Sequence, residues 1–280
     1  MHGSTAMDTG TLESRYSEVC ERIAAAARRS GRLPEDVILV AVSKGADPEQ
    51  SRALLELGHR DLGENRVQQL VQRAAMVEEY IKRLRVLPNA QQERTSREQA
   101  ARSTLGSTQA AGVPESVRWH MIGHLQRNKA RKAVELCRLI HSVDSLRLAE
   151  EVQVFASRHE HPVEVLVQVN CSLEGQKFGC PIAAALPLCE QIETMVNVRV
   201  RGLMTMAAEG RSGDARGTFA RCRELFEELT RRGVGEGRFN LLSMGMSGDY
   251  EAAIEEGANI VRVGTAIFGA SAPEEPGVHG

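Results

Sequence analysis

The feature that most constrains the fold of this chain is a regular alternation of short apolar runs with longer amphipathic stretches. The apolar runs are rich in β-branched residues, which is typical of parallel strands buried on both faces. The amphipathic stretches carry apolar residues at helical spacing. About eight strand–helix units follow one another, which predicts an α/β fold: a single-domain (β/α)8 TIM-type barrel with an extra N-terminal helix. A doubly wound open sheet is the alternative.

The expected elements follow from these periodicities and from the turn residues at their ends. Strands are expected at 37–45, 59–62, 117–122, 139–143, 163–169, 198–204, 240–244 and 259–263. Helices are expected at 12–29 (capped by Thr11), 48–57, 65–84, 126–137, 145–158, 181–195, 213–232 and 249–256. Residues 11–280 form the expected barrel, and residues 1–10 a flexible N-terminus. The stretch at about 85–116 has too little apolar periodicity to offset its ordering entropy, so we expect a mobile insertion there.

The composition excludes several classes of protein. The formal net charge of -2 argues against a nucleic-acid binder, and no apolar run approaches the roughly 20 residues that span a membrane. The N-terminus lacks the basic start and apolar centre of a secretion signal, so we expect a cytoplasmic protein whose six cysteines are free thiols. His120 and His124 have a metal-like spacing but lack the glutamate of a zinc-protease helix, and no metal site is expected.

Lys44 lies near the end of a nearly unbroken apolar run, Val-Ile-Leu-Val-Ala-Val-Ser-Lys-Gly. Because side chains alternate along a strand, Lys44 shares a face with Val40 and Val42, at the carboxyl end where barrels carry their functional residues. Partial desolvation would lower the pKa of the amine and make its neutral, nucleophilic form accessible. The alternative is a lysine that simply extends from a strand end into water.

The last two strands carry candidate anion-binding residues. Barrels often bind phosphate with the loops after these strands, through backbone N–H groups and helix N-termini. Ser247, Gly264 and Thr265 suit such a site, although Ser247 could instead cap a helix and Gly264 could form a tight turn. Arg262 interrupts an otherwise apolar strand. A buried guanidinium needs an acceptor, which is either a carboxylate from a neighbouring strand or a ligand atom.

Two further loops are expected at the same end of the barrel. Asn65 follows Gly63-Glu64 at the end of the second strand, and it either caps the next helix or contacts a ligand. The loop at 170–179, after the fifth strand, includes Lys177. Lys177 could attract an anion, although most loop lysines are merely solvated.

Five short motifs then occur in order along the chain. They are Ala-Val-Ser-Lys, Gly-Glu-Asn, Trp-His-Met-Ile-Gly-His-Leu-Gln-Arg-Asn-Lys, Leu-Ser-Met-Gly-Met-Ser-Gly-Asp and Val-Arg-Val-Gly-Thr-Ala-Ile-Phe-Gly. Each motif alone is weak, but together they resemble the pyridoxal phosphate homeostasis protein family, a single-domain relative of the alanine racemase barrel. The resemblance runs from about residue 12 to residue 270, leaving out the insertion.

This resemblance implies that pyridoxal 5′-phosphate (PLP) is held as a covalent Schiff base on Lys44. It implies phosphate contacts from Ser247, Gly264 and Thr265. It also implies that Arg262 faces the pyridine nitrogen and that Asn65, the asparagine of the Gly-Glu-Asn motif, is a cofactor-binding residue. It also implies a PLP homeostasis role, with PLP-dependent apoenzymes as recipients of the cofactor. We expect a monomer that binds neither nucleic acid nor membrane. Gly45-Ala46-Asp47 departs from the family's usual residues after the lysine.

Arg262 can only donate hydrogen bonds, so a pyridine nitrogen facing it stays unprotonated and is a poor electron sink. A racemase would also need a second base, but Tyr16, Tyr80 and Tyr250 all fall on expected helices, away from strand ends. We therefore expect a non-catalytic PLP carrier and assign no catalytic residue. The rivals are a PLP-dependent amino-acid racemase, a lysine Schiff-base lyase without cofactor, and a scaffold whose bound PLP is vestigial.

Overall fold

The structure is a computed structural model that describes residues 11–86, 116–172, 178–207 and 212–269. The expected N-terminus at 1–10, nearly all of the expected insertion at 85–116, and Lys177 lie outside the described residues. Among the described residues, no helix has both the length and the apolar character needed to cross a membrane.

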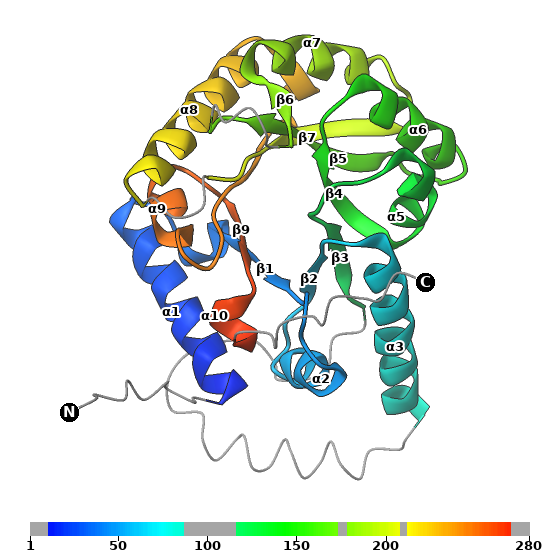
Figure 1. Ribbon diagram of the computed structural model, residues 1–280, viewed down its shortest axis with the longest axis vertical. Helices are drawn as coiled ribbons and strands as arrows, with labels where there is room; N and C mark the ends of the chain where they lie inside the picture. The colour runs from blue at the N-terminus through cyan, green and yellow to red at the C-terminus, as the bar shows by residue number, and fades with distance from the viewer. Residues whose placement is uncertain (1–10, 87–115, 173–177, 208–211, 270–280) are drawn as a thin grey trace, which may run out of the picture.

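Eight parallel strands form a closed barrel, as predicted, and not an open sheet (Figure 1). The strands pair in the order β4-β3-β2-β1-β9-β8-β7-β5, and β5 pairs back with β4 to close the ring. A two-residue strand, β6, pairs with the end of β5 and was not predicted. The strands are β1 (Ile38–Val42), β2 (Asp61–Glu64), β3 (Arg118–Met121), β4 (Cys137–Val143), β5 (Val163–Asn170), β6 (Cys180–Pro181), β7 (Val198–Met204), β8 (Leu241–Ser243) and β9 (Ile260–Val263).

The second strand is the one whose position was predicted least well. It was expected at 59–62 and lies instead at Asp61–Glu64, so that Gly63 and Glu64 belong to the sheet. Glu64 is fully buried and accepts a hydrogen bond from Ser43 of the neighbouring chain segment at 2.6 Å. A carboxylate is tolerated in a buried strand only where such partners compensate for its lost hydration.

Helices surround the barrel on its outer side (Figure 1). They are α1 (Leu12–Arg29), α2 (Pro48–Glu56), α3 (Val67–Val86), α5 (Ala130–Leu136), α6 (Leu146–Ala156), α7 (Ile182–Glu193), α8 (Ser212–Arg231), α9 (Tyr250–Glu255) and α10 (Thr265–Phe268), with short 3-10 turns η1 (Pro34–Asp36), η2 (Arg127–Lys129) and η3 (Val234–Gly237). As predicted, Thr11 caps α1, because its Oγ1 accepts from the Ser14 amide at 3.2 Å. The four-residue α10 was not predicted.

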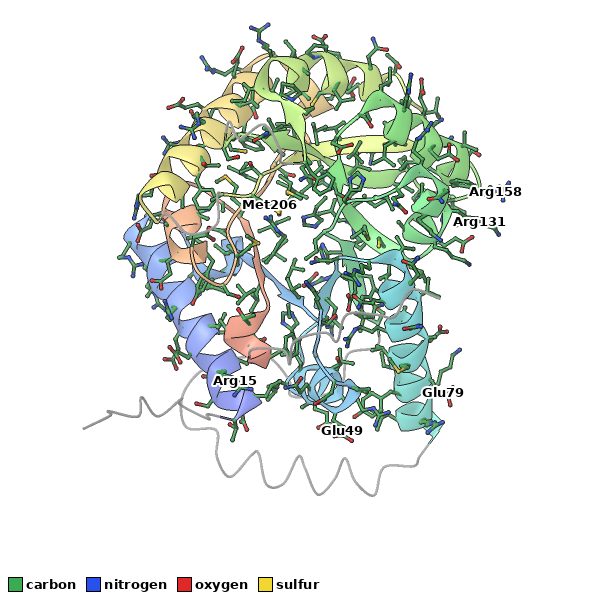
Figure 2. All side chains as sticks on the ribbon, in the orientation of Figure 1. Arg15, Glu49, Glu79, Arg131, Arg158 and Met206 are labelled. Atoms are coloured by element: carbon green, nitrogen blue, oxygen red, sulfur yellow. The ribbon has the colours of Figure 1, made fainter. Side chains whose placement is uncertain are left out.

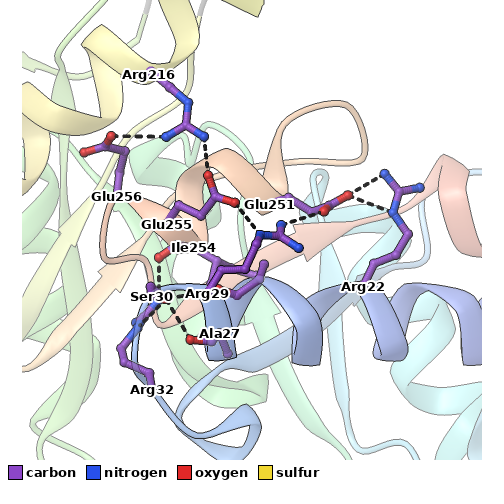
Figure 3. A network of polar contacts seen from close by, with 11 residues as sticks. Arg22, Ala27, Arg29, Ser30, Arg32, Arg216, Glu251, Ile254, Glu255 and Glu256 are labelled. Atoms are coloured by element: carbon purple, nitrogen blue, oxygen red, sulfur yellow. Dashed lines mark hydrogen bonds and ion pairs between the residues drawn. The ribbon is translucent and has the colours of Figure 1, made fainter.

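The N-terminal helix completes the helical ring. α1 packs against α9, α10 and α2 on the outer side of the barrel (Figure 1). Exposed ion pairs reinforce this contact (Figure 3): Arg29 of α1 donates to Glu251 at 3.0 Å and to Glu255 at 2.8 Å. Arg216 of α8 pairs with the same Glu255, which links three helices.

The apolar core has an inner and an outer part. The outer part fills the space between strands and helices. The inner part is a cluster inside the barrel formed by Val40, Leu139, Leu166, Met204 and Ile260. In Figure 2, Met206 lies inside the ring of strands, whereas Glu79, Arg131 and Arg158 point outward.

Candidate functional site

The carboxyl ends of the strands place the predicted residues around one end of the barrel. Lys44 lies in the turn that follows β1, two residues after the strand ends at Val42. Its side chain is exposed, so the expectation of a partly desolvated amine is wrong. The physical reason is that the chain leaves the sheet before Lys44. The exposed position leaves the amine accessible from solvent.

A buried ion pair holds the turn that carries Lys44. Arg73 of α3 contacts Glu64 Oε1 through its Nε at 2.7 Å and donates through Nη2 to the Ala46 carbonyl oxygen, also at 2.7 Å. Ser43, directly before Lys44, donates to the same Glu64 oxygen at 2.6 Å. Burial raises the pKa of Glu64, and the bonds from Ser43 and Arg73 oppose that rise. The sequence analysis missed Arg73, because a helix pattern does not show which arginine turns inward.

Asn65 is half-buried directly after β2. Its backbone lies against Gly123, which follows the end of β3: a Cβ atom added to Gly123 would come within 2.2 Å of the Asn65 carbonyl oxygen. Gly123 is thus required for the close approach of two loops. α3 begins at Val67, two residues after Asn65. Whether Asn65 contacts a ligand stays a prediction.

The loops after β8 and β9 meet at Ser247. Its hydroxyl oxygen accepts hydrogen bonds from the amides of Gly264 at 3.1 Å and Ala266 at 3.4 Å. Thr265, the first residue of α10, is exposed. A Cβ on Gly264 would lie 3.2 Å from the Val42 carbonyl oxygen, so this loop packs directly against the end of β1. Ser247, Gly264 and Thr265 therefore come together beside the turn that carries Lys44.

Arg262 is 3% exposed, and its protein acceptors are not the carboxylate that was one of the two alternatives; the contact with a ligand atom stays a prediction. Its Nη1 donates to Ser243 Oγ at 2.6 Å, and its Nη2 donates to the Thr205 carbonyl oxygen at 2.9 Å. Both acceptors are neutral, so the expected carboxylate partner is wrong. Burial lowers the pKa of Arg262 to about 10, and the charge of Asp249 opposes this. The group thus remains a cation at neutral pH.

Polar contacts continue from Arg262 across the barrel. Ser243 Oγ lies 3.0 Å from His141 Nδ1, and His141 Nε2 lies 2.9 Å from His120 Nδ1. His120 Nε2 lies 3.0 Å from Asp61 Oδ1. We call these five residues, Arg262, Ser243, His141, His120 and Asp61, the interior chain. Its last four members were not predicted as a network, although a polar residue two positions after Leu139 or Leu241 was a usable signal for His141 and Ser243.

His124 and Phe178 lie beside the same end of the barrel. Their rings stack with centroids 4.3 Å apart and an angle of 18° between the planes. His120 is a member of the interior chain, so the two histidines of the metal-like spacing have separate surroundings. Within the described ranges, no group of three or more His, Cys, Asp or Glu side chains is arranged to hold a metal ion.

Comparison with known proteins gives a consistent result over most of the chain. Residues 21–272 match the family described as alanine racemase, N-terminal domain. The pyridoxal phosphate homeostasis protein of Pseudomonas aeruginosa is 35% identical over 263 residues, covering 93% of this chain and 96% of that protein. The Escherichia coli K12 protein of the same name is 32% identical over 254 residues, covering 91% and 94%.

A solved structure shows the same relationship in three dimensions. The structure of PipY from Synechococcus elongatus PCC7942 with PLP bound superimposes with a TM-score of 0.68 at 33% identity. The match covers 90% of this chain and all of PipY.

Proposed function

The chain belongs to the pyridoxal phosphate homeostasis protein family, and from this premise we propose that it binds PLP as a Schiff base on Lys44 and holds it without turnover. The bound PLP of PipY supports the choice of cofactor. When bound, PLP supplies an aldehyde for an amine to attack and a pyridine ring that can withdraw electrons.

The residues at the end of the barrel fit this cofactor. Lys44 offers an exposed primary amine for the aldehyde. In the adjoining loops after β8 and β9, the hydroxyls of Ser247 and Thr265 offer hydrogen-bond donors for a phosphate, and the amides of Gly264 and Ala266 hold the Ser247 hydroxyl in place. The close approach of Gly264 to Val42 sets these two groups side by side, as one small molecule with both functions requires. Asn65 completes the proposed set.

The proposal that the protein is non-catalytic is supported by the surroundings of Arg262. It is a buried cation whose acceptors are both neutral oxygens, so no nearby carboxylate can pass a proton to a ring nitrogen through it. A guanidinium can only donate, and it keeps a pyridine nitrogen facing it unprotonated. This weakens the electron withdrawal that racemisation requires.

The positions of the tyrosines argue in the same direction. Tyr16 contacts His59 Nδ1 through its hydroxyl at 3.1 Å, and Tyr80 donates to Glu56 at 2.5 Å. Tyr250 is buried in the outer core. Tyr16 and Tyr80 are engaged with other side chains, and Tyr250 is buried against the loop after β8, which argues against each as the second base of a racemase.

The exposure of Lys44 also supports a carrier that gives PLP to other proteins. A Schiff base is exchanged when a second amine attacks it, and an exposed site admits that amine. We propose PLP-dependent apoenzymes as the recipients and a monomeric, cytoplasmic carrier. The six free cysteines fit a reducing compartment. Mixing the PLP-loaded protein with an apoenzyme and measuring recovered enzyme activity tests the transfer, and size-exclusion chromatography tests the monomer.

Borohydride reduction followed by peptide mass mapping tests the covalent site. We expect a phosphopyridoxyl label on Lys44, and loss of the label and of the visible absorbance in Lys44→Ala. Lys132→Ala is the control, because Lys132 is an exposed lysine paired with Glu135 on α5. A label on another lysine would overturn the assignment. Retained absorbance in Lys44→Ala would do the same.

Incubation of the PLP-loaded protein with each common L-amino acid tests the absence of turnover. We expect no accumulation of the D-enantiomer. Steady formation of a D-amino acid would replace the carrier with the racemase alternative.

A further inference from the structure

The interior chain runs from the functional end of the barrel toward its opposite end. Leu139, Leu241 and Ile260 point into the barrel, and His141, Ser243 and Arg262 follow them by two positions on the same face. Asp61 is the first residue of β2, at the amino end of the strands. The chain thus connects a buried cation near the Lys44 end with a carboxylate near the other end.

When both imidazoles are neutral, hydrogen-bond chemistry allows only one direction along this chain. Arg262 cannot accept, so Ser243 Oγ accepts from it and turns its own hydrogen toward His141 Nδ1. His141 must then carry its hydrogen on Nε2 and donate it to His120 Nδ1. His120 in turn donates from Nε2 to Asp61, whose carboxylate can only accept. The reverse order would require an imidazolium on His120 that donates to both His141 and Asp61.

The charges around the chain agree with this assignment. Burial, together with the charge of the neighbouring Arg262, holds the pKa of His141 well below its ordinary value, so His141 is neutral. Burial alone would raise the pKa of Asp61, but hydrogen bonds from His120 and Arg118 outweigh it and lower that pKa to about 2. Arg118 is half exposed, so the chain ends in an ion pair that reaches solvent.

We propose that Ser243, His141, His120 and Asp61 act as one unit that positions Arg262 and aims its N–H groups toward the bound ligand. This inference rests on the proposed function, since Arg262 faces the PLP ring only if PLP binds there. Ser243 Oγ accepts from Nη1 of Arg262, and the Thr205 carbonyl oxygen accepts from Nη2. The guanidinium has further N–H groups that can donate to the ligand. The two histidines are positioning residues.

The direction of the chain can be tested without PLP. In protein labelled with 15N-histidine, two-bond 1H–15N spectra at neutral pH distinguish the tautomers of each ring. We expect His141 and His120 to be neutral and protonated on Nε2. An Nδ1–H tautomer, or an imidazolium, at either residue would overturn the proposal.

The effect on the ligand is tested with 15N-labelled PLP. We expect His141→Leu and His120→Leu each to shift the pyridine 15N resonance and to weaken PLP binding by about tenfold. The double variant should be no weaker than either single variant, because one break already interrupts the unit. His59→Leu is the matched control: His59 is also buried and bonds to Tyr16 and the Asp61 carbonyl oxygen, but lies outside the chain.

His141→Gln, which can still accept and donate, should recover part of the binding, and this variant addresses the case in which His141→Leu does not fold. Equal effects in His59→Leu, or additive losses in the double variant, would overturn the unit. If the wild-type protein takes up no PLP, the proposed function fails. The histidine tautomers measured without PLP still test the direction of the hydrogen bonds along the interior chain.

Discussion

The interior chain and the ion pairs between the outer helices (Figure 3) are built from similar residues but differ in exposure. All five members of the interior chain are buried. On the outside, Arg22 and Arg29 of α1 have side chains 52% and 50% exposed, and they share Glu251 of α9. Water can replace a lost partner outside but not inside. The number of charged residues in a network is therefore a poor guide to its contribution to the free energy of unfolding.

The same rule applies to the buried pair of Glu64 and Arg73, and breaking it should give the largest effect. Arg73→Met leaves a buried carboxylate without its cation, so we expect a loss of about 3 to 5 kcal/mol in the free energy of unfolding. Urea denaturation measures it. Arg83→Met is the matched control, because Arg83 pairs with Glu79 on the same helix with both side chains exposed. Equal losses in the two variants would contradict the comparison.

The interior chain should show a smaller effect that depends on pH. The pKa of Asp61 is about 2 in the folded protein against an ordinary 3.8, which corresponds to about 2 kcal/mol of stability. Because the folded pKa is the lower one, this contribution is complete above the ordinary pKa and is lost as the pH falls from about 4 toward 2.

The difference in unfolding free energy between wild type and Asp61→Asn, measured in urea at several pH values, checks this contribution. We expect the difference to shrink over that acidic range. A difference that stays constant would show that the hydrogen bonds from His120 and Arg118 do not hold Asp61 ionised.

The outer ion pairs should give the smallest effect. Arg22→Gln removes an exposed partner of Glu251, so we expect a loss below about 1 kcal/mol. Salt screens exposed charges, so the loss should decrease further at high ionic strength. Thermal unfolding at low and high NaCl concentration measures it. A loss as large as that of Arg73→Met would remove the distinction between the two regions.

The sequence predicted repeating elements better than it predicted contacts. The expected strand at 198–204 and the expected helix at 12–29 coincide with β7 and α1, because apolar periodicity reflects burial directly. The strand at 59–62 was placed two residues too early, because the partners that make Glu64 acceptable in a strand are Ser43, directly after β1, and Arg73 of α3. Local pattern cannot supply such distant partners.

In the candidate site, too, individual residues were predicted better than the contacts between them. Lys44 and the Ser247–Gly264 pair were predicted from their places at strand ends, which a barrel brings together by its topology, and Arg262 was predicted because it interrupts an apolar strand. The acceptors of Arg262 and the four residues behind it were not found. Asp61, His120, His141 and Ser243 are far apart in the sequence, and each alone resembles an ordinary buried polar residue.

The barrel and the strand ends around which a site could form were predictable from the sequence alone, since unbroken apolar runs that alternate with helical patterns leave few ways to bury the apolar surfaces. The exposure of Lys44, the neutral acceptors of Arg262 and the hydrogen bonds that lead from it to Asp61 became visible only in the folded protein. The physical reason is that hydrogen bonds depend on distances of a few ångströms between residues from different strands, and closing the barrel sets those distances.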